Sequence, residues 1–176
     1  TFPLDRPFLV LATQNPVDQE GTYPLPEAQV DRFMLKVNIE YPTRSEELEI
    51  MRRMSNMNYK AEVNTILTKE DIFAIRDEIN NVALSEAIEN YIVSLIMASR
   101  NPDEYKLKEG KYMQYGCSPR ATISLNLAAK ATAYLKGRDF VLPEDVKAIA
   151  HDVLGHRILL NYEAEADGIK QKDIVD

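Results

Sequence analysis

The chain has 176 residues, of which 45% are hydrophobic and 28% charged, and its formal net charge is -7 at pH 7. This composition is that of an ordinary soluble globular protein, and the acidic balance argues against a general nucleic-acid or anionic-membrane binder, because both need a basic surface. The single cysteine excludes an internal disulfide and no apolar run approaches the ~18 residues of a membrane-spanning helix, so we expect a cytoplasmic protein without membrane insertion.

Two apolar segments near the start of the chain have strand character. Residues 8–12 are continuously apolar, which is typical of a strand covered on both faces in a parallel sheet. Residues 33–39 alternate at their end and predict a second strand nearer an edge, and residues 27–30 between them form at most a short helix. Two strands bury too little to form a sheet alone, so we predict the end of a larger α/β domain; a partner that completes the sheet is the alternative.

From Pro42 onward the pattern becomes helical. Ser45 is the predicted N-cap of a helix over residues 46–54, and the polar stretch that follows, residues 55–64, is a candidate linker. Residues 68–71, Thr-Lys-Glu-Asp, have the form of a capping box and predict the start of another helix.

Three further helices are predicted in the second half. Ser85 caps a helix whose apolar residues recur on one face and which ends at Asn101. Ser118, followed by a proline, opens an alanine-rich helix that stops at Gly137. Pro143 starts the last helix, which has a clear apolar stripe.

The predicted fold class is therefore mainly α with a small α/β remnant. Residues 1–42 would be the last strands of an α/β core, residues 43–67 a helix and linker, and residues 68–176 a helical domain. Residues 103–117 are predicted to be a loop, and the tail from Asn161 is polar with little pattern.

Asn15 stands just past the carboxyl end of the first predicted strand. Ligands bind at that edge in open parallel sheets, and a carboxamide there could hold a water molecule or a phosphate oxygen. The alternative is that asparagine before proline merely begins a turn.

Two arginines are candidates for binding an anion. Arg32 has the planar guanidinium that suits a phosphate, although an ion pair with Glu27 or another carboxylate is the alternative. Arg120 lies in the first turn of the helix after Ser118, where free N–H groups and the helix dipole favour an anion. A phosphate would offset the cost of a cation there, and an ion pair with an acidic residue of another element is the alternative.

The sequence lacks several kinds of site. No glycine begins the G-x-x-x-x-G-K-[ST] phosphate loop, and no apolar strand ends in Asp-Glu, so the magnesium carboxylates of a P-loop enzyme are also missing. No nucleophile or metal-ligand constellation replaces them, and His151 and His156 are expected to be packing or surface residues.

Two long motifs carry a family resemblance. LATQNPVDQEGTYPLPEAQVDRF, residues 11–33, resembles the segment of MoxR-type AAA+ ATPases from the sensor-1 strand to the arginine finger. GCSPRATISLNLAAKATAYLKGRDFVLPEDVKAIAHDVLGHRI, residues 116–158, resembles the sensor-2 helix and the end of the lid domain in the same family. Magnesium chelatase subunits and MCM helicases share the broader clade.

The resemblance implies a role for each of the three candidate residues. Asn15 would be sensor 1, which orients the attacking water, and Arg32 would be the arginine finger, which reaches the nucleotide of the neighbouring subunit. Arg120 would be sensor 2, acting on its own nucleotide or a neighbour's. An arginine finger is worth on the order of 10³–10⁵ in rate in other NTPases.

The resemblance also implies what the full-length protein does. It would bind ATP and Mg²⁺, form a homo-oligomer, in the family a hexameric ring, and act as a chaperone-like remodeller, often with von Willebrand factor A-type partners. This chain would be the carboxyl-terminal fragment, inactive alone because the phosphate loop is missing. The alternatives are a non-enzymatic helical interaction module and a relative of the magnesium-chelatase or MCM type.

Overall fold

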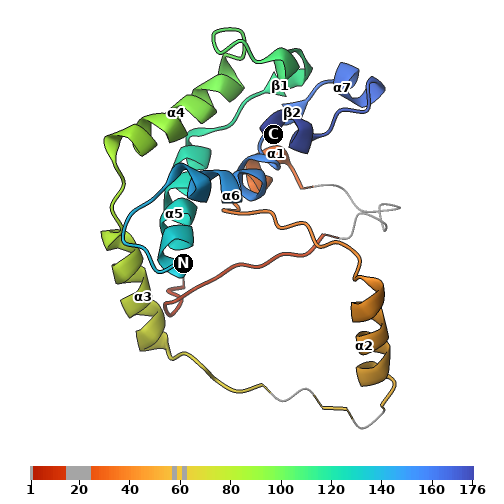
Figure 1. Ribbon diagram of the computed structural model, residues 1–176, viewed down its shortest axis with the longest axis vertical. Coiled ribbons are helices and arrows are strands. Elements are labelled where there is room, and N and C mark those ends of the chain that lie inside the picture. The colour runs from red at the N-terminus through yellow and green to blue at the C-terminus, as the bar shows by residue number, and fades with distance from the viewer. Residues whose placement is uncertain (1, 15–24, 57–58, 61–62) are drawn as a thin grey trace.

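The computed structural model describes residues 2–14, 25–56, 59–60 and 63–176. Figure 1 shows a mainly helical chain, in agreement with the predicted class. The elements in chain order are α1 (Glu27–Val30), α2 (Arg44–Met54), α3 (Lys69–Asn81), α4 (Glu86–Arg100), the 3₁₀ turn η1 (Lys108–Tyr112), β1 (Met113–Tyr115), α5 (Pro119–Leu135), α6 (Pro143–Leu154), β2 (Leu159–Leu160), α7 (Tyr162–Ala166) and α8 (Gln171–Val175). None of the described helices is both long and apolar enough to cross a lipid bilayer.

Capping residues begin most of the predicted helices. The Thr68 hydroxyl accepts from the Asp71 N–H, and the Asp71 carboxylate accepts from the Thr68 N–H, so the predicted capping box is confirmed. Ser85 caps α4 and Ser118 caps α5, also as predicted.

The predicted cap of α2 was wrong by two residues. Thr43, not Ser45, is the N-cap, because the residue three positions later is Glu46 and the pair forms a reciprocal capping box. The Ser45 hydroxyl lies inside the first turn and bonds to the Thr43 hydroxyl at 3.1 Å. The helix therefore begins at Arg44.

The hydrophobic core lies between α4, α5 and α6. Small side chains on α5 let its neighbours approach closely, and those of Ala121, Ala129 and Ala133 are fully buried. The larger core side chains are Ile92, Ile96, Leu125, Val146 and Val153. Burying each of these contributes roughly 1.5–3 kcal/mol. We call residues 69–176, which hold this core, the helical cluster.

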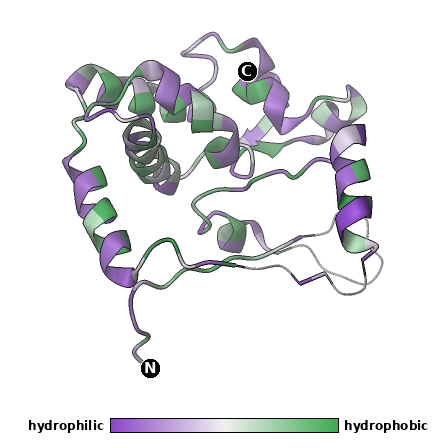
Figure 2. Cartoon of the chain, turned by 60° about the horizontal axis from the view of Figure 1, so that its bottom comes forward, coloured by the Kyte–Doolittle hydropathy of each residue, from purple (hydrophilic) through white to green (hydrophobic). Residues whose placement is uncertain are grey.

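Helix α2 stands apart from the helical cluster, as Figures 1 and 2 both show. It has no buried residue, and its apolar side chains, among them Leu48, Ile50 and Met51, are exposed. Residues 35–43 before it and the described residues between it and α3 belong to no helix or strand. The helix therefore rests on its capping box and its own hydrogen bonds within the described part of the chain.

The two predicted strands do not form. Residues 8–12 and 33–39 carry no strand pairing in the described chain, and most of their apolar side chains are exposed. A strand is stable only when it forms hydrogen bonds with a neighbouring strand. The described residues contain no strand beside either segment. The second segment is held differently, since the Lys36 N–H donates to the Asp152 carbonyl of α6 at 2.8 Å.

The observed sheet is a different and smaller one. β1 and β2 pair antiparallel, with Met113 opposite Leu160 and Tyr115 opposite Leu159. It joins the predicted loop 103–117 to the end of the chain, where α7 and α8 replace the patternless tail that we expected.

A buried carboxylate fixes the turn between α5 and α6. Asp145, at the start of α6, is completely buried and receives two hydrogen bonds from Arg138, at 2.6 and 2.7 Å, and one from Lys136 at 3.0 Å. It also accepts the Leu142 N–H, which would otherwise be a free donor at the helix start. The hydrogen bonds from Arg138 are the main reason that the pKa of Asp145 lies far below its usual range, against the opposing effect of burial.

Candidate functional site

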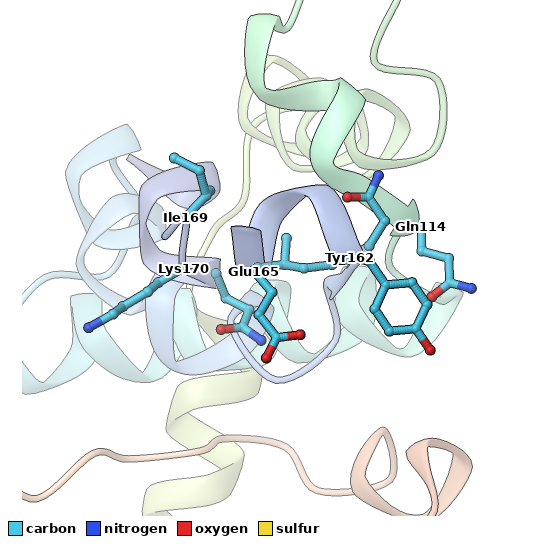
Figure 3. Close-up of a pocket in the computed structure, with 8 residues that line it drawn as sticks. Gln114, Tyr162, Glu165, Ile169 and Lys170 are labelled. Carbon is cyan, nitrogen blue, oxygen red and sulfur yellow. The ribbon is translucent and has the colours of Figure 1, made fainter. Parts of the chain in front are cut away.

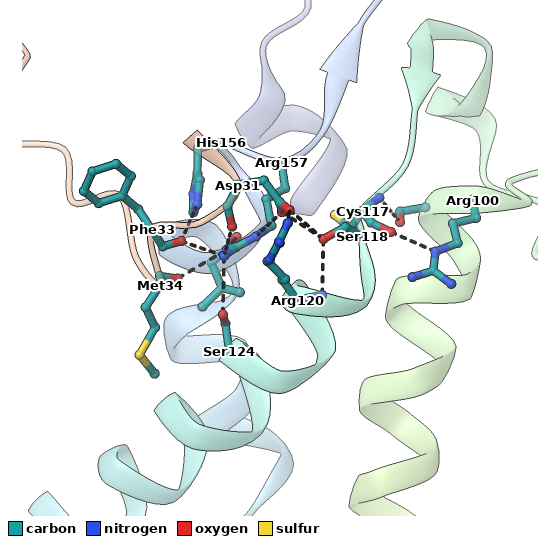
Figure 4. Close-up of polar contacts among 12 residues, drawn as sticks. Asp31, Phe33, Met34, Arg100, Cys117, Ser118, Arg120, Ser124, His156 and Arg157 are labelled. Carbon is teal, nitrogen blue, oxygen red and sulfur yellow. Dashed lines mark hydrogen bonds and ion pairs between the residues drawn. The ribbon is translucent and has the colours of Figure 1, made fainter. Parts of the chain in front are cut away.

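The turn after α1 is joined to the helical cluster through the carboxylate of Asp31. Figure 4 shows the cation and hydroxyl groups that surround it. The Ser118 hydroxyl donates to it at 2.9 Å, Arg120 Nη1 at 2.9 Å and Arg157 Nε at 3.1 Å. Burial opposes ionisation, but the hydrogen bonds from Arg120, Ser118 and Arg157 outweigh it, so the pKa of Asp31 lies below its ordinary value.

Arg157 is the buried centre of this junction, and its side chain is only 1% exposed. Besides the Asp31 carboxylate, it donates to the carbonyls of Asp31 at 3.1 Å, Phe33 at 2.6 Å and Met34 at 3.2 Å. It also donates to the carbonyl of Val153 and, at 3.3 Å, to the hydroxyl of Ser124. Every N–H of the guanidinium can therefore find an acceptor, as a buried arginine requires.

Arg32 lies in the middle of the turn that Arg157 holds. Its side chain is exposed and makes no hydrogen bond or ion pair with any described residue, so the alternative of an ion pair with Glu27 is not what this part of the chain contains. The backbone N–H of Arg32 donates to the Gln29 carbonyl at 3.3 Å. The result is a guanidinium that has no partner among the described residues, on a backbone that Arg157 holds.

Arg120 forms an ion pair with an acidic residue of another element, which was the alternative to a bound phosphate. It lies in the first turn of α5, bonds to Asp31 at 2.9 Å and keeps 55% of its side chain exposed. The anion at this helix N-terminus is thus a carboxylate of the chain itself. Asn15, the third predicted site residue, falls outside the described residues.

His156 packs beside the junction. Its Nε2 lies 3.2 Å from the Phe33 carbonyl, and its buried Nδ1 has no hydrogen-bond partner in the described chain. Burial, and secondly the charge of Arg157, lower the pKa of His156. His151 is on the surface, 3.0 Å from the carboxylate of Asp176.

The hollows on the surface of the described residues include one at the junction and one farther from it. The smaller, about 160 Å³, opens on the junction itself and is lined by Asp31, Ser118, His156 and Arg157 together with Glu27, Ala28, Gly116 and Leu159. The larger, about 470 Å³, lies beside β2, α7 and α8 (Figure 3). Its charged lining residues are Glu165 and Lys170.

Gly116 sets how closely the start of α5 approaches α4. A Cβ at this position would collide with the backbone of Ser99 and Arg100. The same contact region is held by the Cys117 N–H, which donates to the Ser99 hydroxyl at 2.9 Å, and by Arg100 Nε, which donates to the Cys117 carbonyl at 2.8 Å.

Gly116→Ala is therefore expected to lower the free energy of unfolding by about 2 kcal/mol, because a backbone clash cannot be relieved by turning a side chain. Thermal unfolding measures the loss. Gly137→Ala is the control: its φ is +72°, but its Cβ would meet open space, so only conformational strain of about 1 kcal/mol is expected. Equal losses in the two variants would contradict the steric account.

Sequence reasoning missed Asp31 and Arg157. A signal for Arg157 was present, since it follows Val153 by four residues and precedes Ile158, which puts a charge on an apolar stripe. Its partner Asp31 stands 126 residues earlier, and no local pattern connects the two.

Two family models match the chain. One, described as the AAA lid domain, matches residues 107–176, and another, described as an ATPase family associated with various cellular activities (AAA), matches residues 1–35. The junction of Asp31 with Ser118, Arg120 and Arg157 thus connects the two matched regions.

Curated and solved proteins resemble most or all of the chain. It is 41% identical to Chaperone MoxR1 of Mycobacterium tuberculosis, over 100% of this chain and 46% of that protein. It is 33% identical to Protein MoxR of Methylorubrum extorquens, over 86% of this chain and 47% of that protein. A crystal structure of a candidate ATPase from Cytophaga hutchinsonii superposes with a TM-score of 0.93 at 58% identity, covering 99% of this chain and 53% of that one. The chain spans about half the length of these relatives.

Proposed function

The chain belongs to the MoxR family of AAA+ ATPases and corresponds to the carboxyl-terminal portion of its members, and we propose that it supplies the arginine finger, both sensors and the lid for ATP hydrolysis. The observation that carries the proposal is the state of Arg32. Its guanidinium is exposed and unpaired among the described residues, while the backbone on either side is fixed by Arg157. A catalytic arginine that acts on a second subunit needs both properties.

The residues present fit a contact with phosphate. Arg32 and the exposed part of Arg120 present positive charge, and Asp31 balances only part of it, since it also pairs with Arg157. In the described ranges there is no group of three or more His, Cys, Asp or Glu side chains that could hold a metal ion. Family membership implies ATP and Mg²⁺ in full-length relatives, and we assign the phosphate loop and magnesium ligands to the half that this chain does not span.

Each site residue has a separate role in this proposal. Arg32 stabilises the charge on the transferred phosphoryl group in the neighbouring subunit's site, and Asn15 orients the attacking water in its own. Arg120, in the first turn of α5, senses the nucleotide. Because Arg32 acts between subunits, turnover requires a homo-oligomer, which we propose to be a hexameric ring with chaperone-like remodelling activity. Partners with von Willebrand factor A-type domains are the family-based expectation.

The proposal is tested by nucleotide binding and ATP turnover in the full-length protein. Asn15→Ala is expected to lower kcat by about 100-fold, because the attacking water is no longer held in line with the phosphoryl group. ATP affinity is expected to change little. Asn126→Ala, an amide two turns into α5, is the matched control and should keep the parent kcat. Equal losses of binding and turnover would assign Asn15 a folding role, and a protein that binds no ATP would favour the helical interaction module.

A further inference from the structure

We propose that Arg157 is a positioning residue for Arg32: it couples the helical cluster to the turn that carries the finger, so that the orientation of the lid sets where the finger points. The inference rests on the proposed function of Arg32 and adds a residue that never touches nucleotide. It is carried by the contacts of one buried guanidinium with the two ends of one exposed turn.

The contacts bracket Arg32 without involving its side chain. Arg157 donates to the carbonyl of Asp31 immediately before it, at 3.1 Å, and to the carbonyls of Phe33, at 2.6 Å, and Met34, at 3.2 Å, after it. Figure 4 shows these bonds converging on one guanidinium. The backbone that carries the finger is thus fixed from both sides while its side chain remains exposed.

The side chain of Arg157 is also held by buried residues of the helical cluster. Its guanidinium bonds to the carbonyl of Val153 in α6 and to the hydroxyl of Ser124 in α5, both of which are buried residues. The side chain is 1% exposed and has little room to change its rotamer. A rotation of α5 and α6 therefore carries the guanidinium with it.

The turn has few independent attachments. Helix α1 has only four residues and none of them is buried. The remaining polar contacts of the turn with the cluster come from Ser118, Arg120 and His156. All three belong to the same cluster as Arg157, as does Asp152, whose carbonyl accepts the Lys36 N–H just after the turn, so these described hydrogen bonds attach the turn to one body.

Arginine is needed at this position for its geometry. The acceptors lie on several sides of the guanidinium, and its planar fork of five N–H groups reaches them together. Lysine has the same charge but presents it from one atom, so it would keep the ion pair with Asp31 and lose several of the backbone bonds. A misplacement of a catalytic group by about 1 Å can cost 100-fold in rate.

The test uses Arg157→Lys in the full-length protein. We expect kcat for ATP to fall by about 100-fold with KM almost unchanged, because the variant's own nucleotide site is intact and only the finger that it gives to its neighbour is displaced. Co-expression with subunits whose phosphate-loop lysine is replaced should restore turnover, since those subunits have a dead site but a correctly placed finger. A merely structural defect in the lid would not be repaired in this way.

Two controls distinguish the outcomes. Arg32→Ala should be restored by the same co-expression; if it is not, the proposed function of Arg32 fails. If Arg32→Ala is restored and Arg157→Lys is not, or if Arg157→Lys turns over ATP at the parent rate, the positioning role is overturned and the finger stands. Arg138→Gln, which weakens the lid at Asp145, should lower thermal stability without creating a defect that mixed rings repair.

A second variant decides the matter if Arg157→Lys does not fold. Asp31→Asn changes a partly exposed residue of the turn rather than the core; its amide oxygen can still accept from Arg157 or from Arg120, and its N–H₂ group then faces the other arginine. It is expected to lower kcat by about tenfold, the effect of losing one charge-assisted hydrogen bond, and to be restored in mixed rings. Parent-level turnover, or a loss that mixed rings leave in place, would overturn the proposal.

Discussion

Arg32→Ala is expected to lower ATP turnover of the full-length protein by on the order of 10³-fold while ATP affinity stays almost constant. The side chain is exposed and makes no hydrogen bond or ion pair within the described residues, so its removal leaves no buried group unpaired and should not lower stability. What is lost is positive charge beside the phosphoryl group of a neighbouring subunit in the transition state, where charge is most valuable.

Steady-state ATP hydrolysis and equilibrium nucleotide binding measure the two halves of this expectation. Arg76→Ala, an exposed arginine on α3, is the matched control and should hydrolyse ATP like the parent. An Arg32→Ala protein with unchanged kcat would refute the finger assignment. A parallel loss of affinity would instead place Arg32 in its own subunit's binding site.

Asp145→Asn is expected to lower the free energy of unfolding by about 3 kcal/mol, the largest stability effect that we expect in the helical cluster. The substitution keeps the shape of the side chain but removes the charge that Arg138 and Lys136 share, and it turns an amide N–H₂ toward their donors. It also weakens the hydrogen bond that the Leu142 N–H donates to this side chain at the start of α6. Urea unfolding of the parent and variant measures the difference.

The same carboxylate gives stability a pH dependence. The ordinary pKa of an aspartate is 3.8, and the pKa of Asp145 in the folded protein is far lower. As pH falls, the Asp145 carboxylate is therefore protonated in the unfolded chain before it is protonated in the folded one. The contribution of Asp145 is therefore fully present above about pH 5 and is lost progressively below about pH 4. Asp145→Asn should flatten this part of the profile, whereas Asp103→Asn, at an exposed position, should leave it unchanged. A parent and an Asp145→Asn profile of equal slope would contradict the assignment.

The helical part of the fold was readable from local signals. Thr68, Ser85 and Ser118 stand where a capping side chain must stand, and each is followed by a helix because the capping bond spans only two or three residues. The apolar face of α4 repeats at helical spacing for 15 residues, long enough to be unmistakable. Helices α7 and α8 have five residues each, too few for periodicity to appear.

Local sequence signals could not predict the absence of the two strands or the contacts of the junction, because both depend on residues that are distant in the sequence. A strand at residues 8–12 depends on neighbours that the local sequence does not contain, and apolar composition alone cannot supply their hydrogen bonds. Likewise, the Arg120 ion pair and the Arg157 bonds depend on Asp31, which is distant in sequence from both. Sequence patterns indicated that Arg32 and Arg120 could bind an anion, but not which anion each would meet.

The carboxylate of Asp31 lies at the amino end of α5 and competes with any bound phosphate for Arg120. A phosphate approaching Arg120 meets a site where an anion is already bound, tethered at an effective concentration on the order of millimolar or more. A ligand that other contacts also hold in place is the kind that can displace it. We therefore expect free inorganic phosphate at low concentration to compete poorly with Asp31 for Arg120.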